Sequence, residues 1–400
     1  MKQKYIFPEG IIMSKWSRAA VLLTLCALLF SMLPLTLTAE PTAPTAPSLS
    51  AQSAVLIEAQ SGKVITEKNK DARLPMASTT KIMTALVALE LAEPRYVITV
   101  DARAVGVEGS SIYLVEGEQL TLEQLIYALL LESANDAATA IAIGLCGSVE
   151  AFAAKMNEKA LALGLQNTHF ENPHGLDGDS HYTTAQELAV IAQHLLQNDL
   201  LRTIVSTRKS TIPHAGNEGS RLLVNHNKLL RLYDGCIGVK TGFTKKSGRS
   251  LVSAAEKNGV TLIAVTLNAP DDWNDHTAMF DYGFTQFESV LLCEKEAFLR
   301  PMPLAGGTDD YVMLCNRDEV RLTLPVGHSE ITHTVEAARF EYAPNSAGEI
   351  LGKVVYRCDT DQDGKAEIIA EVPLHACYAV ERNTPQKGFW AWLKALLKIK

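Results

Sequence analysis

The stretch "PMASTTK", residues 75–81, leads directly into an apolar run, "IMTALVALEL", residues 82–91. Ser and Thr before an apolar run are typical of a helix N-terminus, because their hydroxyl groups accept hydrogen bonds from free backbone N–H groups. Ser78 is also followed three residues later by Lys81, which places both side chains on one face of a helix. These seven residues therefore indicate either a helix cap or a serine with a lysine partner.

A serine hydroxyl is a weak nucleophile and needs a neighbouring base. Lys81 can be that base only when it is neutral, and burial or nearby cations lower the pKa of a lysine. At a helix start, Ser78 would also lie near backbone N–H groups and the positive end of the helix dipole, which stabilise a developing oxyanion. The Ser-x-x-Lys spacing is common by chance, so alone it favours the cap.

Two further motifs change this balance. Ser133-Ala-Asn135 lies in "LLLESANDAATA", at an expected turn between two helices. Lys240-Thr241-Gly242 lies on an expected strand that ends at a loop, where Lys and Thr can hold an anion. Gly242 lacks a side chain, so a substrate backbone could approach the strand edge. The three motifs in this order are the set found in penicillin-binding proteins and class A β-lactamases.

The hydrophobic pattern predicts an α+β fold. Strands are expected at 53–59 and 63–68, as a hairpin, and at 235–243, 249–256 and 260–267, with a tight turn at Asn258-Gly259. Helices are expected after Pro75 and at 121–131, 136–145, 149–163, 184–197 and 273–284. This order predicts an antiparallel sheet flanked by helices over residues 51–290. Short strand-like runs then predict a small all-β domain over residues 291–385.

The N-terminal 39 residues have the order of a secretory signal peptide: Lys15 and Arg18, an apolar run at 19–35, then small residues up to Ala39. An uncleaved anchor is the alternative, but the run is shorter than the roughly 20 residues that a span needs, and Pro34 interrupts it. Cleavage is expected after Ala39, and Met13 is an alternative start. The following "EPTAPTAPSLS", residues 40–50, is expected to be a linker.

The last segment, "KGFWAWLKALLKIK", residues 387–400, predicts an amphipathic helix within a terminal unit at 386–400. Such a helix is too short to span a bilayer but suits lying in its surface, with Trp at headgroup depth and Lys toward anionic lipid. Docking on the protein's own core is the alternative. The lysine-only polar face on an acidic chain favours the membrane. The apolar half comprises Phe389, Trp390, Trp392, Leu393, Leu396, Leu397 and Ile399, with Lys387, Lys394 and Lys398 opposite.

Composition argues against some classes of function. The 400 residues carry a formal net charge of −8 and only 6% aromatic residues, which argues against a nucleic-acid-binding surface. Cys26 lies in the signal segment. Six other cysteines permit disulfides in an exported chain, but buried free thiols are equally compatible and no pairing is predicted. The lack of a C-x-x-C pair argues against metal or redox chemistry. The six are Cys146, Cys236, Cys293, Cys315, Cys358 and Cys377.

The resemblance to a known family extends beyond the three motifs. Residues 50–290 closely resemble the low-molecular-mass penicillin-binding proteins, the serine-type D-alanyl-D-alanine carboxypeptidases; the β-domain and terminal helix match that family more loosely. The resemblance implies a β-lactamase-like fold and the D-Ala-D-Ala end of peptidoglycan stem peptides as substrate, with β-lactam antibiotics as covalent inhibitors. It is carried by "SAVLIEAQSGKVITEKN", "LPMASTTKIMTALVALE", "LLLESANDAATAIA", "FENPHGL", "HYTTAQELA" and "DGCIGVKTGFTKKSGRSLVSAA".

The same resemblance implies roles for single residues. Ser78 would form the acyl-enzyme, Lys81 would be its general base, and Ser133 would relay the proton toward the leaving D-Ala amine. Water would then release the acyl group, and no metal or cofactor would be needed. The substrate-binding residues would be Asn135 for the substrate amide, Lys240 and Thr241 for the terminal carboxylate, Gly242 for close approach, and Phe243, whose backbone N–H would form the oxyanion hole with that of Ser78.

Other features have alternative interpretations. Glu171 in "FENPHGL" lies where a class A β-lactamase carries a deacylating glutamate, but the loop resembles that of the carboxypeptidases. "DTDQDG", residues 359–364, begins like a calcium loop, yet its twelfth position is Ala370, so a turn is expected. The histidines show no ligand spacing. Arg249 is either a substrate contact or a surface charge. A β-lactamase, a D-Ala endopeptidase and a non-catalytic wall-binding protein are the competing functions.

Overall fold

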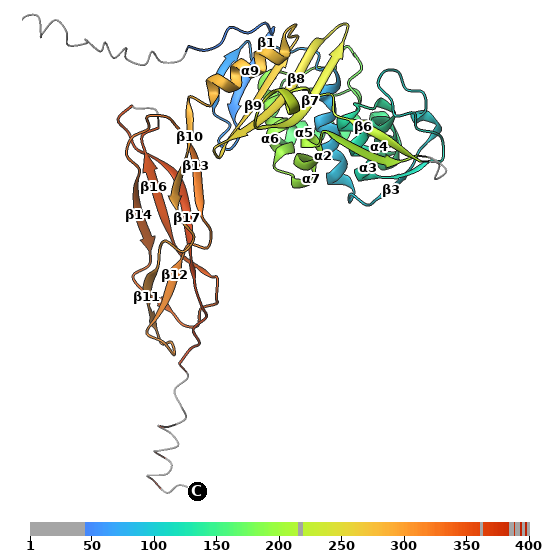
Figure 1. Ribbon diagram of the computed structural model, residues 1–400. Coiled ribbons are helices and arrows are strands. Elements are labelled where there is room, and N and C mark those ends of the chain that lie inside the picture. Colours follow the sequence, from blue (N-terminus) through green and yellow to red (C-terminus); the bar gives the residue numbers. More distant parts are fainter. Residues whose placement is uncertain are drawn as a thin grey trace, which may run out of the picture. The chain divides into compact units, whose positions relative to one another are not determined.

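The computed structural model describes residues 45–214, 219–360 and 363–383, with Gly388, Leu393 and Leu397 as isolated positions. The expected signal peptide and nearly all of the expected terminal helix lie outside these residues, and both stay predictions. Figure 1 shows the order of the elements along the chain.

The Lys240-Thr241-Gly242 motif lies on a five-stranded antiparallel sheet with the order β2-β1-β9-β8-β7. Strand β1 pairs with β9 from Ser53↔Leu267 onward, so the two ends of this region meet in the middle of the sheet. The turn between β8 and β9 holds Asn258 and Gly259 at φ of 51° and 80°, as predicted for a tight hairpin. Strand β7 is an edge strand. The strands are β1 (Ser53–Glu58), β2 (Val64–Lys68), β7 (Cys236–Thr244), β8 (Gly248–Lys257) and β9 (Val260–Leu267).

Helices cover both faces of this sheet. Successive side chains of a strand point to opposite faces, and in this sheet the side chains on both faces are apolar. In β1, Val55 and Ile57 join one buried cluster, whereas Ala54 and Leu56 join another. The larger cluster packs the sheet against most of the helices, and the smaller one packs it against α9 and the short helix α8 (Leu229–Leu232). The predicted helices are confirmed as α2 (Lys81–Leu91), α3 (Leu122–Leu131), α4 (Asn135–Cys146), α5 (Val149–Ala162), α6 (Ala185–Leu196) and α9 (Asp272–Gly283).

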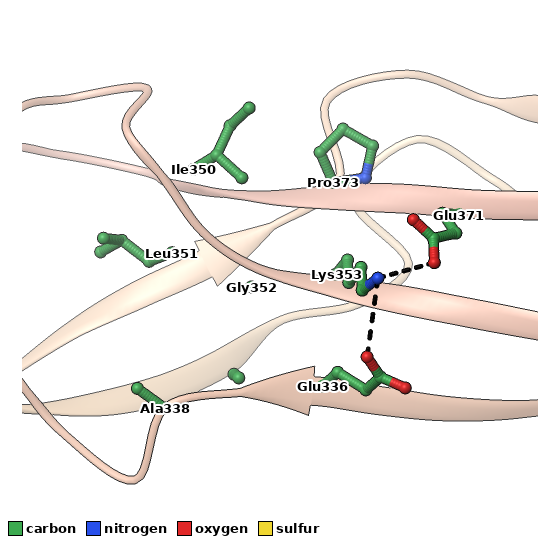
Figure 2. Close-up of a pocket in the computed structure, with 9 residues that line it drawn as sticks. Glu336, Ala338, Ile350, Leu351, Gly352, Lys353, Glu371 and Pro373 are labelled. Carbon is green, nitrogen blue, oxygen red and sulfur yellow. Dashed lines mark hydrogen bonds and ion pairs between the residues drawn. The ribbon is translucent and has the colours of Figure 1, made fainter.

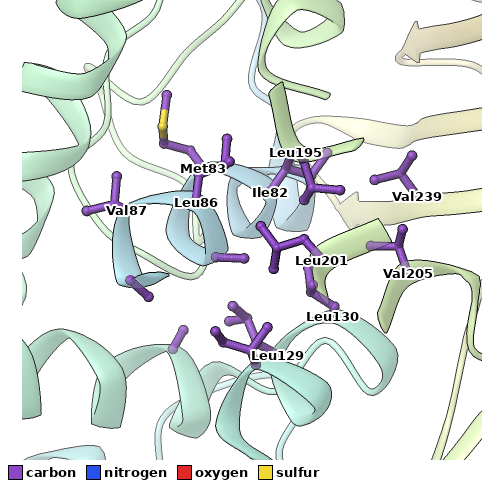
Figure 3. Close-up of a cluster of buried hydrophobic side chains, with 14 of the residues drawn as sticks. Ile82, Met83, Leu86, Val87, Leu129, Leu130, Leu195, Leu201, Val205 and Val239 are labelled. Carbon is purple, nitrogen blue, oxygen red and sulfur yellow. The ribbon is translucent and has the colours of Figure 1, made fainter. Parts of the chain in front are cut away.

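The core near the catalytic motifs joins residues that are far apart in the sequence. Ile82 and Leu86 of α2 pack with Leu130 of α3, Leu195 of α6 and Val239 of β7 (Figure 3). Burying aliphatic side chains of this size stabilises the fold by about 1.5–3 kcal/mol each. The core therefore fixes the start of α2, which carries the Ser-x-x-Lys motif, against β7, which carries Lys-Thr-Gly.

Several elements had no clear signal in the sequence. They are η1 (Ala77–Thr80), β3 (Val97–Thr99), η2 (Ala102–Ala104), β4 (Gln119–Thr121), α7 (Asp199–Ser206), β5 (Lys209–Pro213), β6 (Ser220–Val224) and α8 (Leu229–Leu232). Within the described residues, no single helix is long and apolar enough to cross a membrane; α4 and α5, which meet at an 86° bend, reach that length and apolarity only as a pair.

In the described residues between Phe287 and Asn383 the regular elements are strands, as the sequence predicts for an all-β region. β10 (Phe287–Cys293) pairs with β13 (Val320–Pro325). A six-stranded sheet has the order β14-β16-β17-β12-β11-β15 and encloses its own buried cluster, which includes Val312, Val354 and Leu374. Its strands are β11 (Arg300–Ala305), β12 (Tyr311–Cys315), β14 (Thr332–Ala337), β15 (Glu341–Tyr342), β16 (Ile350–Cys358) and β17 (Glu367–Ala376).

A groove of about 630 Å³ lies on this β-region, beside β14, β16 and β17 (Figure 2). Its one cationic side chain among the lining residues, Lys353, donates to Glu371 at 2.6 Å and lies 3.6 Å from Glu336. One cation between two carboxylates leaves these three residues with a formal net charge of −1, and the rest of the lining is apolar. No residue of the three catalytic motifs lines this groove.

The loop between β16 and β17 contains the calcium-like "DTDQDG". The Asp359 carboxylate accepts hydrogen bonds from the backbone N–H groups of Asp363 at 3.1 Å and Gly364 at 2.7 Å. An Asp that bonds backbone N–H groups a few residues ahead stabilises a turn. The described part of this loop thus agrees with the expected connection between two strands.

Candidate active site

Ser78 lies in η1, a single 3₁₀ turn that precedes α2. The neighbouring hydroxyls of Thr79 and Thr80 donate to the carbonyls of Met76 at 2.6 Å and Ala77 at 2.7 Å. No side chain caps α2. The cluster therefore gives local hydrogen bonds to carbonyls three residues back rather than a side-chain cap, and Ser78 Oγ, at the helix start, faces a lysine.

Lys81 is the first residue of α2 and is fully buried. Its Nζ lies 3.0 Å from Ser78 Oγ and donates to Asn135 Oδ1 at 2.7 Å and to the carbonyl of His174 at 2.5 Å. A neutral Nζ has two N–H groups, so these two acceptors leave its lone pair for the Ser78 hydroxyl. Burial holds the pKa of Lys81 well below its usual value, and the positive charge of Lys240 lowers it further, against an opposite effect of Asp136. A neutral amine beside a hydroxyl is what a lysine base requires.

Ser133 lies in the predicted turn between α3 and α4, and Asn135 is the first residue of α4. The Asn135 side-chain amide donates to the Glu108 carbonyl at 2.6 Å, and the opposite end of that amide holds Lys81. Ser133 is buried and has a φ of 60°, a left-handed conformation that is uncommon outside glycine and clusters at functional sites. The turn thus aims one hydroxyl and one amide at the same place.

Strand β7 brings the third motif beside η1. A Cβ atom on Gly242 would lie only 3.1 Å from the backbone nitrogen atoms of Ser78 and Thr79, so a side chain here would push the two segments apart. Lys240 is buried, and this burial lowers its pKa to about 7, while the charge of Glu132 acts in the opposite direction. Its Nζ donates to the Thr241 carbonyl at 2.9 Å.

A cleft of about 360 Å³ opens where the three motifs meet. Of the predicted site residues, Ser78, Ser133, Thr241, Gly242 and Phe243 line it. The other three, Lys81, Asn135 and Lys240, are buried behind its wall. The structure thus brings all eight residues together. The lining is completed by Ser110, His226, Lys228, Arg249, Asp272 and Trp273.

Arg249 and Glu171, which the sequence left ambiguous, differ in position. Arg249 lines the cleft, bonds to Asp272 Oδ1 at 2.9 Å and lies 5.5 Å above the Trp273 ring. Glu171 is exposed and is not among the residues that line the cleft. Its backbone N–H donates to His181 Nδ1 at 3.1 Å. This position does not support the role of catalytic base that was considered for Glu171.

Some contacts at the site carried no signal in the sequence. One is the backbone carbonyl of His174, which accepts from Lys81 Nζ and does not depend on the identity of a side chain. Gly175 has a φ of 88°, and a Cβ atom there would lie 2.0 Å from the Ala77 carbonyl oxygen. Glu132 accepts from the Val224 N–H at 2.5 Å and lies 3.2 Å from His226 Nε2. Among these contacts, the sequence offered a signal only at Gly175, the glycine of "FENPHGL", whose missing side chain lets this loop approach Ala77.

The acid-rich segments do not gather around a metal position. In residues 45–214, 219–360 and 363–383, no three His, Cys, Asp or Glu side chains are grouped so that they could hold a metal ion.

Comparisons with known proteins agree with this geometry. A family model, Peptidase_S11, described as D-alanyl-D-alanine carboxypeptidase, matches residues 40–271. The chain is 32% identical over 354 residues to the D-alanyl-D-alanine carboxypeptidase DacF of Bacillus subtilis (strain 168), which covers 86% of this chain and 88% of DacF. It is also 32% identical to DacA of Escherichia coli (strain K12), over 82% of this chain and 85% of DacA.

Solved structures extend the likeness to the fold. Penicillin-binding protein 5 from Haemophilus influenzae superposes with a TM-score of 0.63 at 29% identity, covering 85% of this chain and 100% of that chain. The predicted fold class, an α+β domain of the β-lactamase type followed by an all-β region, is confirmed by this match. The chain therefore belongs to the D-alanyl-D-alanine carboxypeptidases of the penicillin-binding protein type, which are serine peptidases that act through an acyl-enzyme.

Proposed function

We propose that Ser78 is the nucleophile of this carboxypeptidase and that Lys81 is its base. Ser78 Oγ attacks the carbonyl carbon between the two D-Ala residues and gives its proton to the neutral Nζ of Lys81. The supporting observation is the 3.0 Å contact between a fully buried lysine amine and this hydroxyl. As the tetrahedral intermediate collapses, the proton reaches the leaving D-Ala amine through the Ser133 hydroxyl. Water then attacks the acyl-enzyme and restores Ser78.

The remaining motif residues hold the substrate. The ammonium of Lys240 and the Thr241 hydroxyl attract the terminal carboxylate, and Asn135 orients the substrate amide while it fixes Lys81. Gly242 leaves the edge of β7 open to a peptide backbone. The N–H groups of Ser78 and Phe243 bind the developing oxyanion. This assignment is supported by the lining of the cleft, which contains Ser78, Thr241, Gly242 and Phe243 together.

The assay that tests this function measures free D-Ala released from diacetyl-Lys-D-Ala-D-Ala. The chain should release one D-Ala per peptide and should form a penicillin adduct. A β-lactamase would hydrolyse the same penicillin adduct rapidly and would leave the peptide intact. Lack of D-Ala release by a folded chain that turns over penicillin would therefore overturn the carboxypeptidase assignment.

Location is a second part of the proposal. A peptidoglycan substrate requires action outside the cytoplasm. The signal peptide at 1–39 would direct export, the linker at 40–50 would precede the peptidase domain at 51–290, and the β-domain at 291–385 would lead to the amphipathic helix at 386–400. Deleting residues 387–400 should move the signal-processed protein from the membrane fraction to the soluble fraction. Retention in the membrane fraction would remove the anchor from the proposal.

A further inference from the structure

The β-region places two cysteines side by side. We propose that Cys315 and Cys377 form a disulfide bond in the exported protein. Their Sγ atoms are 2.8 Å apart, only about 0.8 Å farther than the roughly 2.05 Å of a disulfide bond. The six cysteines beyond the signal segment can form fifteen different cysteine pairs, and this contact selects one pair.

The strands around the two cysteines favour the bond. Cys315 ends β12 and Cys377 follows β17, which is the neighbour of β12 in the sheet. The register pairs Leu314 with Ala376, and the Cys377 N–H donates to the Met313 carbonyl at 2.8 Å. This ladder puts both cysteines on the same face of the sheet at diagonal positions, where side chains are within reach of each other. The hydrogen-bonded backbone thus holds the two sulfurs close before any bond forms.

The other cysteines are placed differently. Cys293 contacts the Asn316 side chain at 3.7 Å, and Cys358 donates to the Ser329 carbonyl at 3.3 Å. Cys146 and Cys236 are half-buried in the peptidase region. Among the described residues, Cys315 and Cys377 are the only two whose sulfurs contact each other. This makes Cys293 and Cys358, which lie in the same β-region, suitable controls.

The bond requires an oxidant, and this part rests on the proposed export. Cys377 is exposed whereas Cys315 is buried, so an external disulfide would meet Cys377 first. The Cys377 thiolate attacks the disulfide of an extracytoplasmic thiol–disulfide oxidoreductase and releases one of its two thiolates. The Cys315 thiolate then attacks the Cys377 sulfur and releases the second. Both cysteine protons go to solvent, and two electrons reduce the oxidoreductase.

The bond would also constrain the chain between the two cysteines. Once formed, the bond closes a 62-residue interval that contains β13, β14, β15, β16 and β17. Closing an interval of this length removes chain entropy from the unfolded state and stabilises the β-region.

The test uses the full chain exported by a host cell and purified without reductant. The protein is denatured in an alkylating reagent, digested and mapped by mass spectrometry. We expect one cross-linked peptide pair, Cys315 with Cys377, and alkylated Cys146, Cys236, Cys293 and Cys358. The Cys358→Ser variant should keep the cross-link, and Cys377→Ser should lose it. Complete alkylation of both cysteines, or a cross-link to a different cysteine, would overturn the proposal.

A second measurement distinguishes the stabilising effect of the disulfide bond from that of a packed free thiol at position 377. Reductant should lower the temperature at which the wild-type β-region unfolds, and should leave the unfolding of Cys377→Ser unchanged. An equal effect of reductant on both proteins would contradict the proposal. Release of D-Ala should stay the same in Cys377→Ser, since neither cysteine lines the cleft. Failure of the proposed function would instead appear as lack of D-Ala release in a protein that carries the cross-link.

Discussion

The Nζ atom of Lys81 lies 3.0 Å from Oγ of Ser78 and donates to two acceptors, the Asn135 side chain and the His174 carbonyl. The lysine is therefore fixed from three directions. Its amine cannot turn away from the hydroxyl without leaving a buried polar group unpaired, which costs about 1–3 kcal/mol.

Ser78→Ala should abolish labelling by fluorescent penicillin and lower D-Ala release at least about 10³-fold, because removing a nucleophile removes the covalent path. The fold should survive, since Ser78 caps no helix. Gel fluorescence and thermal unfolding measure the two effects. Persistent labelling of the variant would show that another residue is acylated.

The pH dependence should reflect Lys240, whose buried ammonium has a pKa lowered to about 7. Below this pH Lys240 is charged and attracts the substrate carboxylate; above it the charge is lost. KM for the peptide should therefore rise as the pH passes upward through about 7. The free energy of unfolding should also increase with pH, between about 7 and the ordinary lysine pKa of 10.5, because the unfolded chain binds one more proton than the folded chain in that range.

Glu132→Gln should shift this rise in KM to lower pH, since the negative charge of Glu132 stabilises the charged form of Lys240. Gln can still accept from the Val224 N–H through its carbonyl oxygen, so the local fold should persist. The exposed Glu116→Gln is the matched control and should leave the KM profile unchanged. An unchanged profile for Glu132→Gln would mean that Lys240 does not respond to this carboxylate.

Arg221→Met should destabilise the protein by about 3–5 kcal/mol, because it leaves the buried Glu118 carboxylate without its partner. Arg221 donates to both Glu118 oxygens, at 2.5 and 2.9 Å, and to the Ile112 carbonyl at 2.8 Å. Arg202→Met breaks the exposed pair with Glu256 and should cost under about 1 kcal/mol. Denaturant unfolding compares them, and equal losses would contradict the argument from burial.

Gly175→Ala should reduce both stability and acylation by penicillin, since its methyl group would overlap the Ala77 carbonyl beside Ser78. Gly106→Ala is the control: it has a φ of 72°, similar to the 88° of Gly175, but no atom within 4 Å of the new methyl group. Gly106→Ala should therefore show only the cost of the left-handed backbone, about 1 kcal/mol. Acylation rates at a fixed penicillin concentration distinguish the two.

Much of this arrangement could be predicted from the sequence. Alternating and helical apolar patterns located the five strands of the sheet and most helices, because both are local signals. The three motifs identified Ser78, Lys81 and Lys240 through their spacing. The Glu132–His226 contact and the His174 carbonyl could not be predicted, since they depend on tertiary packing. The lack of a side-chain cap on α2 could not be predicted for a related reason: hydroxyl residues before a helix can bond backward as well as forward.

The pairing of β1 with β9 has a consequence for the order of folding. β9 lies between β1 and β8, so the sheet is complete only after residue Leu267 has been synthesised. Closing a chain segment of about 200 residues is slow compared with forming local helices. Ser78 is made early, yet β7 and its Lys-Thr-Gly motif join β1 in the sheet only through β8 and this late strand. We therefore expect a growing chain to react with peptide or penicillin only once nearly the whole peptidase region exists.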